Sequence, residues 1–142
     1  MSTFNVILCP VDQSEHSDRA VRYAGDLASL GGGVVHLLHV REREVVHSKF
    51  SGSFELETND EVESLLAKEI GALRSADVKV TAQVLRGRVE DTARAIVDVA
   101  GEISADVIVM GTRGLTAFGA LMLGSTTYKV LHSATCPVVV VP

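Results

Sequence analysis

The chain has 142 residues, enough for one ordinary domain with a substantial core, and its 13 basic and 18 acidic residues give a net charge of -5. This charge and the lack of a long Lys/Arg run argue against nucleic acid as a partner. No stretch approaches the roughly 20 apolar residues of a membrane span, and none has the layout of a signal peptide. We therefore expect a cytoplasmic protein. Hydrophobic residues make up 46% of the chain but aromatic residues only 4%, which predicts a core of Val, Leu, Ile and Ala, as in a buried parallel sheet.

The first predicted strand, Phe4 to Val11, leads into a helix for which Ser14 offers the N-cap. Apolar residues recur at helical spacing after that cap (Ala20, Val21, Ala24, Leu27 and Ala28). Three consecutive glycines at positions 31–33 end the helix, and a near-continuous apolar second strand follows over Val34 to Val40.

The next segment, residues 41–57, has no steady hydrophobic period and is predicted to form a long loop. Phe50 and Phe54 lie among its polar residues, so a lid, a partner surface and a plain surface loop all stay open. After it, Thr58 to Glu61 fits a capping box that opens a second helix, with Glu69 as a single polar residue on an otherwise apolar face.

Alternating apolar and polar residues from Val78 to Val84 predict a third strand with one wet side, which is typical of a sheet edge. A third helix, a fourth strand, a last helix and a fifth strand follow, at Val89–Ile103, Ala105–Met110, Thr126–Ser133 and Pro137–Val141. The count is five strands and four helices.

This strict alternation predicts right-handed crossovers and a parallel sheet. We expect a single doubly wound α/β domain over residues 1–142, with a five-stranded parallel sheet in the order 3-2-1-4-5 and helices on both faces. The topological switch point then lies between strands one and four, and ligands bind outside the carboxyl ends of strands at such a point. The strand order by itself therefore predicts where a ligand binds.

Glycines gather after the fourth strand, in the segment GTRGLTAFGALMLGST. Two residues separate Gly111 from Gly114, and nine residues separate Gly114 from Gly124, which directly precedes Ser125. Glycine amides can approach an anion closely, and the start of the last helix favours a phosphate, so the spacing indicates a phosphate cradle. The chain has neither GxGxxG after the first strand nor GxxxxGK[ST], which argues against Rossmann dinucleotide and Walker-type binding.

The glycine spacing, together with VDQS after the first strand, resembles the ATP-binding branch of the universal stress protein family. The resemblance spans the whole chain, from ILCPVD through VLRGRVED to DVIVMGTRG and the terminal CPVVVV. It implies an adenine nucleotide alpha hydrolase-like fold that binds ATP, with Mg²⁺. Thr126, Thr127 and Tyr128 depart from the family, which often continues with a hydrophobic residue after the GS pair.

The resemblance also implies a set of nucleotide-contacting residues. Asp12 would serve the ribose or a nucleotide-bound Mg²⁺, and Val40 would meet the adenine through its backbone. The full implied set is Pro10, Val11, Asp12, Val40, Met110, Gly111, Arg113, Gly114, Gly124, Ser125, Thr126 and Thr127. Gly87 is a weaker candidate, because it lies beside the same edge of the sheet.

Three functions are consistent with this pattern. The first is an ATP-binding regulatory or stress-response protein with little or no ATP turnover. The second is a weak ATP hydrolase or other nucleotide-converting enzyme, although no His, Glu or Lys in the motif is obviously placed as a general base. The third is a dimeric interaction module without a nucleotide. A phosphoacceptor switch is disfavoured, because only Asp12 fits its acidic pattern.

Other reactive residues receive structural interpretations. His36 and His39 lie three apart in a strand and so face opposite sides, and no metal site is proposed. Cys9 lies in an apolar strand without an evident base and is predicted to be a buried, inert thiol. The final strand, Val138 to Val141, is an uncharged edge that needs a cover. The resemblance implies pairing with the same strand of a second copy, so a homodimer is expected.

Overall fold

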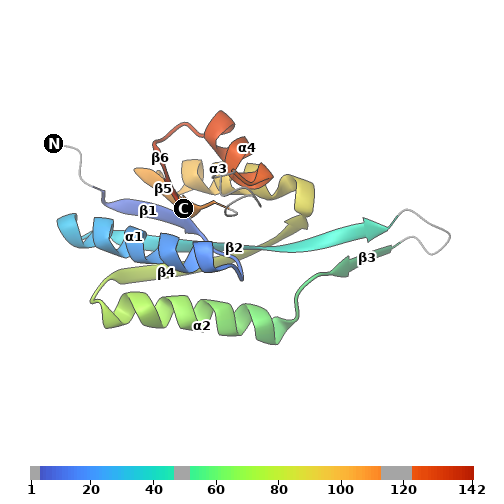
Figure 1. Cartoon of the computed structure of the whole chain (residues 1–142), viewed down its shortest axis with the longest axis horizontal. Helices are drawn as coiled ribbons and strands as arrows, with labels where there is room; N and C mark the ends of the chain where they lie inside the picture. Colours follow the sequence, from blue (N-terminus) through green and yellow to red (C-terminus); the bar gives the residue numbers. More distant parts are fainter. Residues whose placement is uncertain (1–3, 47–51, 113–122) are drawn as a thin grey trace.

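The structure is a computed structural model that describes residues 4–46, 52–112 and 123–142. Within these ranges, strands and helices alternate along the chain (Figure 1). The strands are β1 (Val6–Pro10), β2 (Val34–Val46), β3 (Gly52–Glu55), β4 (Lys79–Arg88), β5 (Val107–Gly111) and β6 (Val138–Val141). The helices are α1 (Glu15–Gly31), α2 (Asn59–Ser75), the short 3-10 helix η1 (Val89–Asp91), α3 (Thr92–Glu102) and α4 (Ser125–Ser133).

Five of these strands form the predicted parallel sheet. β1 pairs with β2 on one side and with β5 on the other, while β4 extends the sheet beyond β2 and β6 extends it beyond β5. The order β4-β2-β1-β5-β6 is the expected 3-2-1-4-5, because β4 is the third and β5 the fourth of the predicted strands. The doubly wound prediction is confirmed, and it places β1 and β5 at the switch point.

The loop prediction for residues 41–57 is wrong in its greater part. β2 continues to Val46, and β3 pairs with its end in an antiparallel hairpin that extends past the rest of the sheet (Figure 1). A two-stranded arm is held by main-chain hydrogen bonds and needs no core-facing apolar stripe. The periodicity that predicts buried strands is therefore missing here, although the strands are present.

The core divides into two layers, one on each face of the sheet. Ile7, Cys9 and Leu37 pack with α1 and α2, whereas Leu8 and Leu38 pack with α3. Successive residues of a strand alternate between faces, so the continuous apolar runs of β1 and β2 supply both layers at once. Figure 1 shows α2 and the α3–α4 pair on opposite sides of the sheet.

Local signals fix where α1 and α2 begin and where α1 ends. The Ser14 side chain accepts from the backbone N–H of Ser17 at the start of α1, and the predicted capping box between Thr58 and Glu61 is present at the start of α2. Gly32 ends α1 with φ 68°, the left-handed conformation that glycine favours. None of the described helices combines the length and apolarity needed to cross a membrane.

Candidate functional site

A cleft lies at the carboxyl ends of β1, β2 and β5, where the strand order predicts a ligand site. Its cavity volume is about 120 Å³. That is below the roughly 300–1,000 Å³ of typical small-molecule pockets, so a nucleotide would extend beyond the described walls. Eight residues of the predicted set line it: Pro10, Val11, Asp12, Val40, Met110, Gly111, Thr126 and Thr127.

The other predicted residues are placed differently. Gly124 is the N-cap of α4 and Ser125 its first residue, so both lie beside the cleft without being part of its lining. Arg113 and Gly114 lie outside the described residues. Gly87 lies within β4, registered opposite Glu42, and does not line the cleft.

The main chain of β2 opens into the cleft at Val40. The Leu38 carbonyl accepts from the Val11 N–H at 2.9 Å where β1 ends, and the Glu42 carbonyl accepts from the Leu56 N–H at 3.2 Å just after β3. Val40 lies between these two bonds, and no residue of β1 or β3 is registered opposite it. Main-chain groups alternate in direction along a strand. The N–H and C=O of Val40 therefore point into the gap between β1 and β3, as one donor beside one acceptor.

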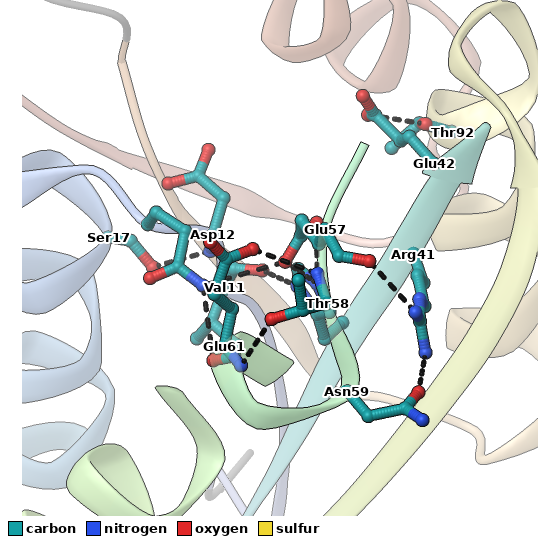
Figure 2. Close-up of polar contacts among 12 residues, drawn as sticks. Val11, Asp12, Ser17, Arg41, Glu42, Glu57, Thr58, Asn59, Glu61 and Thr92 are labelled. Carbon is teal, nitrogen blue, oxygen red and sulfur yellow. Dashed lines mark hydrogen bonds and ion pairs between the residues drawn. The ribbon is translucent and has the colours of Figure 1, made fainter. Parts of the chain in front are cut away.

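Asp12 is held in place where β1 turns into α1. Its Oδ1 accepts from the backbone N–H of Ser14 at 2.8 Å, and its own N–H donates to the Ser17 hydroxyl at 3.0 Å. Figure 2 shows Asp12 and Ser17 beside Val11 at this turn. These two bonds fix the backbone of the turn and leave the second carboxylate oxygen of Asp12 to other partners.

A hydrogen bond between His39 and Glu57 joins β2 to the segment that precedes α2. His39 is 2% exposed; its Nδ1 donates to the Val11 carbonyl at 2.7 Å, and its Nε2 lies 2.9 Å from Oε2 of Glu57. A carbonyl can only accept, so Nδ1 carries a proton, and Nε2 is hydrogen-bonded to the Glu57 carboxyl group. Arg41 donates to the Glu57 carbonyl at 2.8 Å and to the Asn59 side chain (Figure 2). This network fixes Glu57 as a wall of the cleft.

Glu42 is the third carboxylate of the cleft, and its side chain lies on the other face of β2 from His39. Glu42 accepts from the Thr92 hydroxyl at 2.8 Å, which joins the end of β2 to the start of α3 (Figure 2). Both residues line the cleft. Each of the three carboxyl groups in the described lining, Asp12, Glu42 and Glu57, is therefore hydrogen-bonded to the protein itself.

The β5 side of the cleft meets the start of α4. The Thr127 hydroxyl donates to the Gly111 carbonyl at 3.0 Å, which holds the first turn of the helix against the end of the strand. That turn has no acidic residue, and no side chain caps it. A β-carbon on Gly111 would lie 2.7 Å from the His16 carbonyl oxygen. This glycine is therefore required for the packing of α1 against β5, whatever it contributes to a ligand.

Thr112, the residue after β5, is 1% exposed and lines the cleft. Its N–H donates to the Val141 carbonyl at 2.9 Å. Its hydroxyl oxygen is buried without a hydrogen-bond partner. Nearly all buried polar atoms in proteins are paired, so this one is an exception that needs an explanation.

The sequence pattern missed seven residues with polar side chains that line the cleft: Ser14, Ser17, His39, Glu42, Glu57, Thr92 and Thr112. The strand order could have indicated some of them, because Glu42 and Thr92 lie near the carboxyl ends of strands. Glu57 gave no such signal, since it reaches the cleft only through the β2–β3 hairpin.

In the described part of the chain, no three His, Cys, Asp or Glu side chains are grouped to hold a metal ion. Cys9 is fully buried and unpaired, and burial raises the pKa of its thiol, with the charge of Glu69 adding to the rise. A protonated, inaccessible thiol is a poor nucleophile, so Cys9 is part of the core.

Comparisons with known proteins give a consistent result. The model of the universal stress protein family matches residues 3–142. A universal stress protein of Mycolicibacterium smegmatis is 36% identical over 146 residues, which cover 95% of this chain and 47% of that protein, so the chain spans about half of it. A Thermus aquaticus universal stress protein is 36% identical over 139 residues, covering 97% of this chain and 98% of its own length. Among solved structures, the universal stress protein from Archaeoglobus fulgidus in complex with dAMP has a TM-score of 0.75 at 24% identity, with 100% of both chains covered.

Proposed function

Because this chain belongs to the universal stress protein family, we propose that its cleft binds an adenine nucleotide, ATP with Mg²⁺, and that the protein is a nucleotide-dependent regulator with little or no ATP turnover. The observation that carries the proposal is the main chain of Val40, which presents a donor and an acceptor to the cleft. The dAMP complex of the structural neighbour supports an adenine nucleotide as the ligand class.

The adenine edge matches the groups that Val40 presents. Adenine carries a ring nitrogen acceptor next to an amino donor, so the Val40 N–H can donate to the former while its C=O accepts from the latter. Guanine presents a ring N–H next to a carbonyl, which is the reverse arrangement. The gap between β1 and β3 therefore favours adenine over guanine.

The phosphates would lie toward α4. The first turn of that helix carries no acidic residue, and its free N–H groups favour an anion. Thr126 lines the cleft at this turn. Asp12 on the β1 side would take a ribose hydroxyl or the nucleotide-bound Mg²⁺ with its second carboxylate oxygen. Arg113 and Gly114 complete the proposed set.

Low turnover follows from how the cleft carboxylates are used. Glu42 is bonded to Thr92 and Glu57 to His39, and the proposal assigns the remaining oxygen of Asp12 to the ribose or Mg²⁺, so it leaves no cleft carboxylate for an attacking water. A regulator would instead transmit the nucleotide state to an interface. The edge strand β6 is the proposed interface, because Val138 to Val140 are only partly buried and an apolar edge invites a second copy.

The test uses two substitutions of Thr126 that differ in charge alone. Thr126→Glu places a negative charge at the helix start, which the helix tolerates but a phosphate does not; Thr126→Gln has the same size without the charge. Calorimetry of ATP with Mg²⁺ should give micromolar binding to the wild type and more than tenfold weaker binding to the Glu variant than to the Gln variant. Equal affinity for both variants would contradict the phosphate placement, and no binding to the wild type would contradict the proposed function.

The regulatory proposal has two further checks. Sedimentation at micromolar concentration should show a dimer, and a monomer would contradict the β6 interface. Phosphate release from saturating ATP should stay close to the rate without protein; steady turnover lost in Thr126→Glu would favour the weak hydrolase instead.

A further inference from the structure

β4 forms one edge of the parallel sheet, and its outer side is open in the described structure. All 10 of its residues are registered against β2, and no described strand pairs with its other side. The main-chain groups of a strand point alternately to its two sides, so every second residue of β4 directs its N–H and C=O away from the sheet. Such a row of main-chain groups is a template on which a further strand can add.

The carboxyl half of β4 presents a stripe of exposed side chains on one face. Val80 packs against the core cluster that α1 and α2 form, and every second residue after it lies on the same face, because side chains alternate along a strand. These residues are Ala82, Val84, Arg86 and Arg88, called here the β4 stripe. All four are exposed, Val84 to 40%, so α2 does not cover them. The stripe is apolar where it begins and basic where it ends.

The basic end of the β4 stripe lies beside two more arginines, which belong to β2. In the register of the two strands, Arg86 lies opposite Arg41 and Arg88 lies opposite Arg43. Registered residues of neighbouring strands share a face, so these pairs place positive charges side by side, where they repel each other. The chain as a whole has a net charge of -5, which makes this concentration of positive charge a local feature.

The acidic neighbours of this end compensate its charge only in part. Glu55 of the hairpin is registered opposite Arg43. Nη1 of Arg88 lies 3.6 Å from Oε1 of Glu90, between side chains that are 49% and 64% exposed. An ion pair between side chains this exposed contributes little, and both arginines stay at the surface. The charge therefore attracts an acidic partner.

We propose that the outer edge of β4 is a docking site for an extended acidic peptide of a partner protein, which adds to the sheet as a further strand. Its apolar side chains would lie against Val84 and its acidic side chains against Arg86 and Arg88. Main-chain hydrogen bonds to the edge would provide affinity, and the side chains on one face would provide specificity.

A second copy of this chain fits this edge poorly. β4 carries Lys79, Arg86 and Arg88 but no acidic residue, so two copies of it would place like charges together. β6, the edge proposed for the dimer, lies at the other end of the sheet. The peptide site therefore goes beyond the proposed function and leaves both the nucleotide cleft and the β6 interface free.

The test uses a fluorescent peptide of defined composition. It alternates threonine with two valines and then two glutamates, which matches the apolar-to-basic order of the β4 stripe. A neutral counterpart has glutamine in place of glutamate, and both peptides are also made in reverse order, because an added strand can run in either direction. Fluorescence anisotropy at low ionic strength, with protein up to millimolar concentration and without nucleotide, measures binding.

We expect the acidic peptide to bind in at least one order, and more tightly than its neutral counterpart. The double variant Arg86→Gln, Arg88→Gln should bind it about 3- to 10-fold more weakly than the wild type, the range that two exposed ion pairs provide. The double variant Arg94→Gln, Lys129→Gln removes the same charge from exposed positions of α3 and α4 and should bind like the wild type. In the complex, amide hydrogen exchange should slow at alternate residues of β4.

Four results would overturn the inference. The first is no binding of the acidic peptide in either order, and the second is equal binding of the neutral peptide or equal loss in the two double variants. The third is binding without slowed amide exchange in β4, because no strand would then have been added. The fourth is a uridine oligonucleotide that binds these arginines more tightly than the peptide does, which would assign them to single-stranded RNA. Since no nucleotide is present in these titrations, each of these results would leave the proposed nucleotide function in place.

Discussion

Replacing Glu69 with Gln should stabilise the protein at alkaline pH and leave its stability unchanged at acid pH. Glu69 lies on the core-facing side of α2, 2% exposed, and its Oε1 has no hydrogen-bond partner. Burial raises its pKa from an ordinary 4.5 to about 7, and the Asp18 carboxylate of α1 adds to the rise as an acceptor and as a like charge. Lys68 and Arg22 partly oppose this rise in the Glu69 pKa.

The sign of the effect follows from this pKa. Between pH 4.5 and about 7 the folded chain holds a proton on Glu69 that the unfolded chain has lost, so the free energy of unfolding falls as pH rises through this window. The stabilisation from protonated Glu69 is complete at pH values below the pKa of the unfolded chain and is lost at pH values above the pKa of the folded chain. The full difference corresponds to about 3 kcal/mol, or roughly 10 °C in melting temperature for a domain of this size.

Chemical unfolding at a series of pH values would measure this dependence. Wild type should lose stability between pH 5 and pH 7.5, whereas Glu69→Gln, which resembles the protonated acid, should lose much less. Glu63→Gln, an exposed neighbour on the same helix, controls for the change in net charge. A wild type whose stability does not fall across this range, or a Glu69→Gln variant that falls equally, would refute the reasoning.

Three further predictions concern packing, capping and thiol burial. Gly111→Ala should lower the free energy of unfolding by about 1–3 kcal/mol, because the added carbon would lie 2.7 Å from the His16 carbonyl oxygen. Gly71→Ala should raise the free energy of unfolding by about 0.5–1 kcal/mol, because the added carbon has nothing within 4 Å and alanine favours the helix. Thr58→Ala should lower the free energy of unfolding by about 1 kcal/mol in a chemical unfolding experiment, since it removes the capping box of α2; no loss would contradict that role. Cys9 should react with a thiol reagent only on unfolding, while the half-buried Cys136 reacts in the native state; equal native rates would contradict the burial.

The fold was predictable because its signals are local and repeated. Apolar runs alternate with helical periods, and the capping residues Ser14 and Thr58 mark two helix starts that the structure confirms. The last helix begins at Ser125, one residue before the predicted start, and the third is preceded by a short 3-10 turn at Val89–Asp91. Such boundaries depend on the packing of each end, which the sequence pattern does not contain.

The cleft was predictable in outline and not in its polar detail. Strand order and glycine spacing point to the edge where Asp12, Val40 and Thr126 meet. Nothing local indicates that Glu57 pairs with His39, because that contact depends on a hairpin without an apolar period. The solitary hydroxyl of Thr112 is likewise visible only once its surroundings are known.

The most direct test of the nucleotide cleft follows backbone amide resonances of isotopically labelled protein during a titration with ATP and Mg²⁺. We predict saturable shifts of the Val40, Thr112 and Thr126 amides, with those of Gly71 and Ala76 unchanged. Shifts confined to other residues, or none at millimolar ATP, would contradict the assignment of this cleft as the nucleotide site.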